Sequence, residues 1–131
     1  MVEFGPDPRQ LAAPGLMIGP LGVPPEMHKA RHCIVISTTT GLTTIVPLST
    51  KAPTHRRAFH HRIPAGKYPS MSVVDDSWTK SDLLTTVSNN RVDRVLVAGR
   101  RTTVIVDPAD LKAVRGTVLH ALQLGRLTAG L

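Results

Sequence analysis

One segment of this 131-residue chain has the clear pattern of an amphipathic helix, and it lies near the C-terminus. Asp107 is a favourable N-cap residue, Pro108 suits the first helical position, and Asp110 places a carboxylate in the first turn, where the helix dipole favours it. Apolar residues then recur at helical spacing at Leu111, Val114, Val118 and Leu122. Gly125 is a suitable residue to end this helix. The rest of the fold must therefore be built from other elements.

The residues before this helix form short β-like runs separated by turn residues. The run His32–Ser37 is apolar on both faces and rich in β-branched residues, which is typical of a central strand. In the next run, Leu42–Leu48, Pro47 predicts a sheet edge or a bulge at the end of the strand. Further short strands are expected at residues 15–21, 60–63, 82–88, 91–97 and 101–106, with a strand-like or irregular segment at 70–79 and turns at 38–41, 64–67 and 89–90.

This order of elements predicts a mainly β protein with one C-terminal helix, in the α+β class. The strands are expected to form a small barrel or a strongly curved sheet, with the helix packed on it. A chain of 131 residues can build one domain with a real core but not two, so we expect a single domain over residues 1–131. Residues 1–13 are expected to form a loose arm.

Positive charge is concentrated in the middle of the chain. The formal net charge is +7, and residues 27–74 (the acid-free stretch) contain no Asp or Glu. The seven basic residues of this stretch are Lys29, Arg31, Lys51, Arg56, Arg57, Arg62 and Lys67. A surface of one sign attracts polyanions, of which nucleic acid is the commonest. Only four aromatic residues are present in the chain, which argues against an aromatic platform for stacked bases.

Several other classes of protein are disfavoured by the sequence. Cys33 is the only cysteine, so a disulfide framework is impossible and a cytoplasmic location is expected. The apolar stretch 11–23 is interrupted by prolines and glycines, which argues against a signal or membrane segment. His28 and His32 lie at a junction between loop and strand, without a supporting cysteine pair, and we expect no metal and no cofactor. The motifs of serine hydrolases and of phosphate-binding loops are missing from the sequence.

Polar residues at strand ends are the best candidates for chemistry. Arg31 directly precedes the first of two consecutive predicted strands, and Ser49 and Thr50 directly follow the second. If the two strands form a hairpin, these residues meet at one rim of the sheet, where a guanidinium beside hydroxyls can hold a phosphate. Lys80 and Asp82 flank the start of a later strand. The alternative interpretation is an ordinary solvated arginine beside turn-forming hydroxyls.

The sequence resembles the MazF/PemK (Kid) family of toxins from type II toxin–antitoxin systems. Arg31 matches the arginine of a Gly-x-Arg-Pro loop, although His32 replaces the proline. Ser49 and Thr50 keep the two hydroxyls of a Val-Pro-x-Thr-Ser/Thr motif, and Lys80-Ser-Asp82 falls where some members have Arg-x-Asp. The segments that carry the resemblance are 29–37, 44–50, 82–94 and 106–122, in family order. Residues 1–25 lack the usual start of the family.

The resemblance implies a small SH3-like barrel that forms a homodimer and cleaves single-stranded RNA without a metal. The ribose 2′-OH attacks the neighbouring phosphorus and leaves a 2′,3′-cyclic phosphate and a 5′-OH, and a cognate antitoxin protein relieves the growth inhibition. Two alternatives remain open. One is a non-catalytic toxin of the same fold, like the CcdB toxins, and the other is a plain nucleic-acid-binding module.

The resemblance also implies roles for individual residues. The catalytic candidates are Arg31, which would stabilise charge on the phosphate, Ser49 and Thr50, which would hold the phosphate or the 2′-OH, and Asp82, as a base or a reader of a base edge. Histidine titrates near neutrality, so His32 and His60 are reserve acid–base candidates. The expected substrate-binding residues are His32, Lys80, His55, Arg56, Arg57, Phe59 and His60, with Phe59 able to stack on one base.

Overall fold

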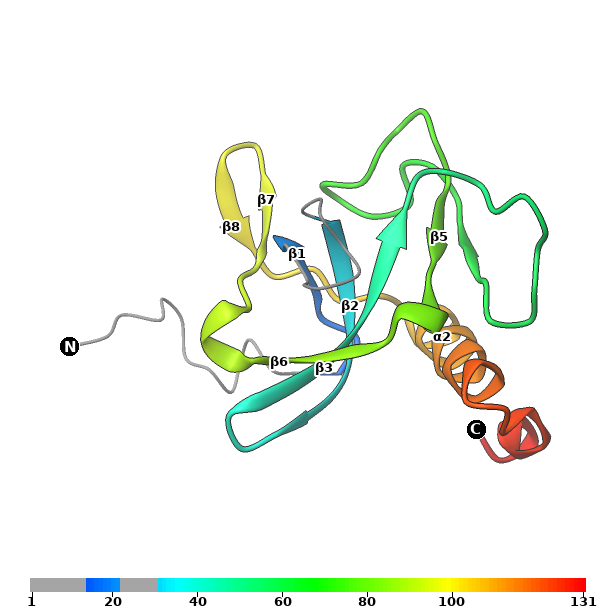
Figure 1. Ribbon diagram of the computed structural model, residues 1–131. Helices are drawn as coiled ribbons and strands as arrows, with labels where there is room; N and C mark the ends of the chain where they lie inside the picture. Colours follow the sequence, from blue (N-terminus) through cyan, green and yellow to red (C-terminus); the bar gives the residue numbers. More distant parts are fainter. Residues whose placement is uncertain (1–13, 22–30) are drawn as a thin grey trace.

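A computed structural model of the chain describes residues 14–21 and 31–131, shown in Figure 1. The expected arm 1–13 and the loop 22–30, with His28 and Lys29, lie outside the described residues. The strands are β1 (Met17–Leu21), β2 (Arg31–Thr39), β3 (Leu42–Ser49), β4 (Arg62–Ile63), β5 (Ser77–Thr79), β6 (Thr85–Ser88), β7 (Val95–Val97) and β8 (Arg100–Thr102). The helices are α2 (Pro108–Ala121) and the short 3-10 helices η1 (Ser81–Leu83), η2 (Asn89–Arg91) and η3 (Gly125–Gly130). None of the helices in this part of the chain is long and apolar enough to cross a membrane.

The strands form an open, strongly curved antiparallel sheet. Its order is β1-β2-β3-β5-β4, and β6 also pairs with β3. The β7–β8 hairpin stands apart at the upper left of Figure 1, whereas α2 lies at the lower right, below β5. Isolated bridges join residues that flank the hairpin to the start of the sheet, Arg94 with Ile18 and Ile105 with Leu16. The prediction of a mainly β fold with a C-terminal helix is confirmed. Within the described residues, strand pairing closes no barrel.

The β2–β3 hairpin is the centre of the sheet. Thr39 pairs with Leu42, so a two-residue turn at 40–41 joins the strands, and Gly41 adopts a φ of 80° there. The prediction that Pro47 marks a sheet edge or a bulge is wrong, because β3 has partners on both sides and the irregularity of the β2–β3 ladder lies between Val35 and Ser37. Pro47 instead lies where β3 changes partner, between Ile45, the last residue paired with β6, and Leu48, the first paired with β5. A proline is tolerated there because neither ladder needs its missing N–H.

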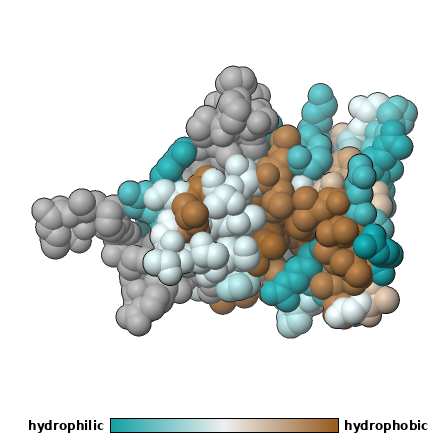
Figure 2. Space-filling model, turned by 60° about the horizontal axis from the view of Figure 1, so that its bottom comes forward, coloured by the Kyte–Doolittle hydropathy of each residue, from teal (hydrophilic) through white to brown (hydrophobic). Residues whose placement is uncertain are grey.

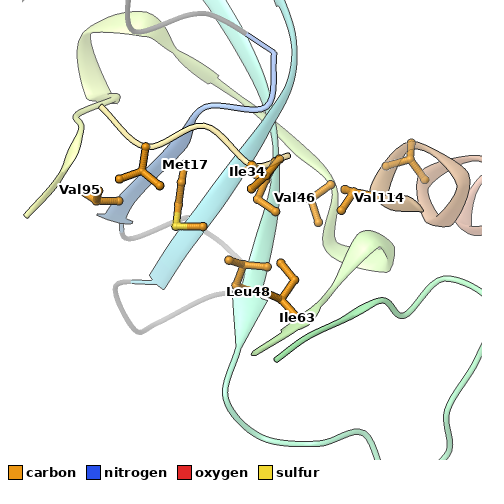
Figure 3. Close-up of a cluster of buried hydrophobic side chains, with 10 residues drawn as sticks. Met17, Ile34, Val46, Leu48, Ile63, Val95 and Val114 are labelled. Atoms are coloured by element: carbon orange, nitrogen blue, oxygen red, sulfur yellow. The ribbon is translucent and has the colours of Figure 1, made fainter. Parts of the chain in front are cut away.

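Two buried clusters pack on the two faces of this hairpin. Cys33 and Val35 of β2 enter one cluster, and Ile34, which lies between them, enters the other. This alternation confirms that the strand is apolar on both faces. The second cluster, in Figure 3, joins four strands of the main sheet to β7 and α2 through Met17, Ile34, Val46, Leu48, Ile63, Val95 and Val114. Burying such side chains typically contributes about 1.5–3 kcal/mol each, so this cluster fixes α2 against the sheet.

The start of α2 agrees with the sequence, but its end does not. The Asp110 N–H donates to Asp107 Oδ1 at 2.7 Å, which is the expected N-cap bond, and Pro108 is the first helical residue. The predicted stop at Gly125 is wrong, because α2 ends at Ala121 and Gln123 takes a φ of 62°. A Cβ at Gly125 would lie 2.5 Å from the His120 ring, so this glycine permits close packing instead of ending the helix.

The predicted strand 82–88 begins three residues later than expected. Residues 81–83 form η1, and β6 starts at Thr85. The reason is a tertiary contact: the buried Ser81 hydroxyl lies 2.7 Å from the Thr117 hydroxyl of α2. The strands predicted at 15–21, 60–63, 91–97 and 101–106 are present but shorter, as β1, β4, β7 and β8, whereas β2 and β3 are slightly longer than predicted.

Candidate active site

A pocket of about 240 Å³ opens where β2 begins and β3 ends. One wall carries Arg31 and His32 from β2, with Ser49 and Thr50 at the end of β3. The opposite wall comes from the segment between β4 and β5, with Ser70, Met71 and Ser72, and from Ser77 of β5. The structure therefore places Arg31, Ser49 and Thr50 at one rim, as the predicted hairpin geometry requires. Their catalytic roles stay predictions.

The two hydroxyls of the rim differ in their surroundings. Ser49 is buried, and its Oγ accepts a hydrogen bond from the Lys51 N–H at 3.2 Å. Thr50 is exposed. The Ser49 bond is the turn chemistry of the alternative interpretation, and it also fixes the hydroxyl at the pocket. Arg31 is half-buried and forms no ion pair with any residue of 14–21 or 31–131.

His32 is the titratable group of the pocket whose charge is most affected by the fold. Burial lowers its pKa from the ordinary value of 6.5, so the imidazole is neutral at pH 7 and able to accept a proton. The adjacent Cys33 faces a buried cluster, and burial raises its pKa to about 12. The thiol is therefore protonated and unreactive at neutral pH.

Asp82 and Lys80 do not line this pocket. Asp82 is exposed on η1, and both residues lie close enough to His60 to affect its pKa. Burial is the main reason that the pKa of His60 is lowered. Arg56 and Arg57 lower it further together with Lys80, whereas Asp82 opposes them. The sequence hypothesis placed Asp82 with Arg31 and Ser49, but the structure groups it with the predicted substrate-binding residues.

The segment between β3 and β4 supplies most of this second group. The Arg57 N–H donates to His60 Nδ1 at 2.9 Å, and the Phe59 and His60 rings pack with centroids 4.6 Å apart. Arg56 lies over the ring of Trp78, 5.5 Å from its centroid. His55 is exposed. Trp78 was not predicted as a site residue, because its pairing with Ser49 across the β3–β5 ladder is a long-range contact that local sequence does not show.

A polar cluster around the buried Asp110, at the start of α2, was also missed. Asp110 accepts hydrogen bonds from Tyr68 Oη at 2.5 Å, Lys67 Nζ at 2.8 Å and His61 Nε2 at 2.9 Å. Lys67 also reaches Asp107 Oδ2 at 2.9 Å, and the Asp107 N–H donates to Tyr68 Oη. We call these five residues the Asp110 network. Two of its members were noted in the sequence for other reasons, Asp110 as a carboxylate in the first turn of the helix and Lys67 as part of the basic surface. Their contact with each other was not predicted.

Hydrogen bonds and burial within the Asp110 network shift the pKa values of its members, so that Asp110 and Lys67 stay charged and Tyr68 stays protonated. Burial raises the pKa of Asp110, but hydrogen bonds from Lys67, Tyr68 and His61 outweigh burial, and its pKa is lowered overall. Hydrogen bonds to Asp110 and Asp107 raise the pKa of Lys67. Burial and the bond to Asp110 raise the pKa of Tyr68 to about 12. The described part of the chain contains no group of three or more His, Cys, Asp or Glu side chains placed to hold a metal.

The basic residues of the acid-free stretch thus fall into two sets. Lys67 pairs with Asp107 and Asp110, and Arg62 pairs with Asp76. The others that the structure describes form no ion pair within residues 14–21 and 31–131, and they are Arg31, Lys51, Arg56 and Arg57. The uncompensated charge therefore lies at the pocket rim and on the segment that follows it.

The curved sheet, C-terminal helix and basic rim define a small, mainly β protein with a basic pocket. Residues 18–122 match the family of PemK-like, MazF-like toxins of type II toxin–antitoxin systems. The chain belongs to this family. A search of curated protein sequences finds no match.

Solved structures of similar fold include three from bacteria. An endoribonuclease in complex with its cognate antitoxin, from a mycobacterial species, has a TM-score of 0.59 and 13% identity, over 85% of this chain and 94% of that one. MazF from Deinococcus radiodurans has a TM-score of 0.57 and 22% identity, over 84% and 94%. The Mycobacterium tuberculosis toxin MazF-mt6 has a TM-score of 0.55 and 15% identity, over 82% and 96%. At these identities the likeness establishes the fold.

Proposed function

We propose that this toxin-family protein is an endoribonuclease that cuts single-stranded RNA sequence-selectively and without a metal. The observation that carries the proposal is the pocket, which brings Arg31, His32, Ser49 and Thr50 together. A cationic group, a proton acceptor and two hydroxyls are what cleavage by a neighbouring 2′-OH requires. The similar solved structures named as endoribonucleases support the same reaction class.

In this mechanism the 2′-OH gives its proton to a base as the 2′-oxygen attacks the adjacent phosphorus. The bond to the 5′-oxygen breaks, and that oxygen takes up a proton from water. The neutral His32 imidazole is the better base, because Asp82 does not line the pocket. Arg31 faces the non-bridging oxygens, where charge develops, and a fixed cationic donor is strongest there. Ser49 and Thr50 hold the phosphate in line. The products are a 2′,3′-cyclic phosphate and a 5′-OH.

The second basic group extends the binding surface for the RNA strand. Arg56, Arg57, Lys80 and Asp82 all lie close enough to His60 to affect its pKa, and Arg56, Arg57 and His60 belong to the segment that leaves the rim at Thr50. Unpaired guanidinium and ammonium groups bind phosphates without regard to sequence. Asp82, the carboxylate among them, would accept hydrogen bonds from a base edge.

We also propose an antitoxin partner and a homodimer, both acting in the cytoplasm. One similar structure holds a cognate antitoxin, and the unpaired basic residues here would attract an acidic partner. Figure 2 shows apolar residues gathered on the face that comes forward from the bottom of Figure 1. Ile36, Val118, Leu119 and Leu131 line an open apolar hollow next to Arg115, which suits burial against a second copy.

The test is cleavage of total RNA by the purified protein in EDTA, with the new 5′ ends mapped. We expect cuts at a short recurring sequence, cyclic phosphate ends, and no cleavage of an oligonucleotide with 2′-deoxyribose at the cut position. Arg31→Ala should abolish cutting. Intact RNA at high protein concentration would refute the proposal.

A non-catalytic toxin of the same fold is the second candidate. The observation in its favour is that the Ser49 hydroxyl already accepts a turn hydrogen bond and Asp82 lies outside the pocket. In that case growth inhibition would survive both Arg31→Ala and Ser49→Ala, with no RNA fragments in the cells.

A further inference from the structure

The second wall of the pocket belongs to a loop that holds its own shape. Residues 64–76 (the 64–76 loop) connect β4 to β5. The Ala65 N–H donates to Asp76 Oδ1 at 2.9 Å, and the Gly66 N–H donates to the Ser72 carbonyl at 2.8 Å. These two bonds join the beginning of the loop to its end. The loop is therefore closed on itself, and its place at the pocket depends on the contacts that attach it to the rest of the molecule.

The Asp110 network attaches this loop to α2. Tyr68 and Lys67 come from the loop and donate to one carboxylate oxygen of Asp110, at 2.5 Å and 2.8 Å. His61, just before β4, donates to the other oxygen at 2.9 Å, since a carboxylate can only accept. The Asp110 side chain is only 8% exposed. Loss of the carboxylate would leave Tyr68 and His61 without this acceptor and Lys67 with Asp107 alone, so Asp110 is the residue of α2 that fixes the loop.

The residues that follow Tyr68 show why attachment matters. Ser70 lines the pocket with a φ of 71°, a left-handed conformation that is costly for serine. Its hydroxyl is buried and has no hydrogen-bond partner among the described residues. Such a conformation persists only where the surroundings hold it, and it is concentrated at functional sites. The contacts that hold it begin two residues away, at Tyr68.

We propose that Asp110 is a positioning residue of the pocket. Through Tyr68 and Lys67 it holds Ser70, Met71 and Ser72 as the wall that recognises the nucleotide beside the cleaved phosphate. Asp110 itself does not line the pocket, so it acts through the loop. Arg31 and Ser49 lie on the other wall, and loss of Asp110 therefore weakens substrate binding and sequence choice more than the chemical step. The proposal rests on the proposed RNA cleavage.

The kinetic test compares Asp110→Asn and Tyr68→Phe with Asp107→Ser on a short fluorogenic RNA. Asp107 contacts the same Lys67 and caps the same helix, and serine keeps the N-cap, so Asp107→Ser is a matched control. We expect KM to rise about tenfold in Asp110→Asn and less in Tyr68→Phe, with kcat within about twofold and cuts at additional sequences. Asp107→Ser should stay close to the wild type. Unchanged KM and sequence choice in both test variants would overturn the proposal.

A second readout is independent of catalysis. Amide hydrogen exchange of residues 66–72 should be faster in Asp110→Asn and Tyr68→Phe than in the wild type and Asp107→Ser. Equal exchange rates in all four proteins would overturn the proposal. If the wild type cuts no RNA, the proposed function fails, and exchange still decides whether Asp110 positions the wall. If Asp110→Asn does not fold, Tyr68→Phe supplies the same comparison.

Discussion

The pocket rim and the Asp110 network both use basic residues of the acid-free stretch, but in opposite ways. At the rim, Arg31 has no carboxylate partner within residues 14–21 and 31–131. In the network, Lys67 meets two carboxylates at 2.9 Å and 2.8 Å. A charge without a partner is available to a ligand, whereas a paired charge stabilises the fold. A count of basic residues in the sequence therefore overstates the basic surface available to a ligand, because residues paired with a carboxylate do not contribute to it.

The largest effect is expected from Arg31, the basic residue of the pocket rim. Arg31→Ala should lower cleavage by about 100- to 1,000-fold, because a positioned donor for the developing charge is lost. The thermal midpoint should change little, since no ion pair is broken. Calorimetry and initial rates on the same RNA check both parts. A large drop in thermal midpoint with modest loss of activity would place Arg31 with the structural residues.

The next effect concerns His32, the neutral group of the rim. Its lowered pKa predicts that activity rises with pH to a plateau, with the midpoint of the rise below the ordinary value of 6.5, because only the neutral ring accepts a proton. His32→Gln should remove this acid limb and reduce the plateau rate on the order of 100-fold. The pH–rate profile of kcat decides it. If the acid limb of the pH–rate profile is unchanged in His32→Gln, the limb reports the titration of another group.

The ion pairs of the Asp110 network should make the free energy of unfolding depend on pH in the acid range. The pKa of Asp110 is lower in the fold than its ordinary value of 3.8, so its contribution is present above that value and lost as pH falls through the lowered one. Asp110→Asn should be less stable at pH 7 by about 1–3 kcal/mol, with the difference narrowing below the ordinary pKa. Urea unfolding at a series of pH values measures it. A difference that stays constant in acid would contradict the assignment.

The smallest effect belongs to the exposed basic segment. Removing Arg57 should weaken binding of a non-cleavable single strand only a few-fold, and it should reduce the slope of log affinity against log salt by about 0.7. Arg62→Ala is the matched control, because Asp76 already pairs with Arg62. Its salt slope should stay near that of the wild type. Equal slopes for the two variants would break the distinction between paired and unpaired charges.

The features that local sequence predicted are those set by neighbouring residues. Asp107 and Pro108 located the start of α2, and the apolar run at 32–37 located β2, because capping and alternation act over a few residues. The rim of Arg31, Ser49 and Thr50 followed from one tight hairpin. Asp110 was not recognised as a site because its partners His61 and Tyr68 lie 49 and 42 residues away in sequence.

Long-range contacts also account for the misplaced elements. The strand predicted at 82–88 begins only at Thr85, because the contact of Ser81 with Thr117 holds residues 81–83 in η1, and Asp82 lies outside the pocket. Pro47 was predicted to mark a sheet edge or a bulge, but it lies where β3 changes from pairing with β6 to pairing with β5. Neither a partner exchange nor a contact to a later helix leaves a mark in the local pattern.

The two-residue turn at 40–41 has a consequence for the order in which the pocket is built. A hairpin that starts at such a turn closes the shortest loop first, and further pairs add outward. Arg31 and Ser49 lie at the far, open ends of the two strands. We therefore expect this end to pair last during folding and to open first when the native sheet fluctuates.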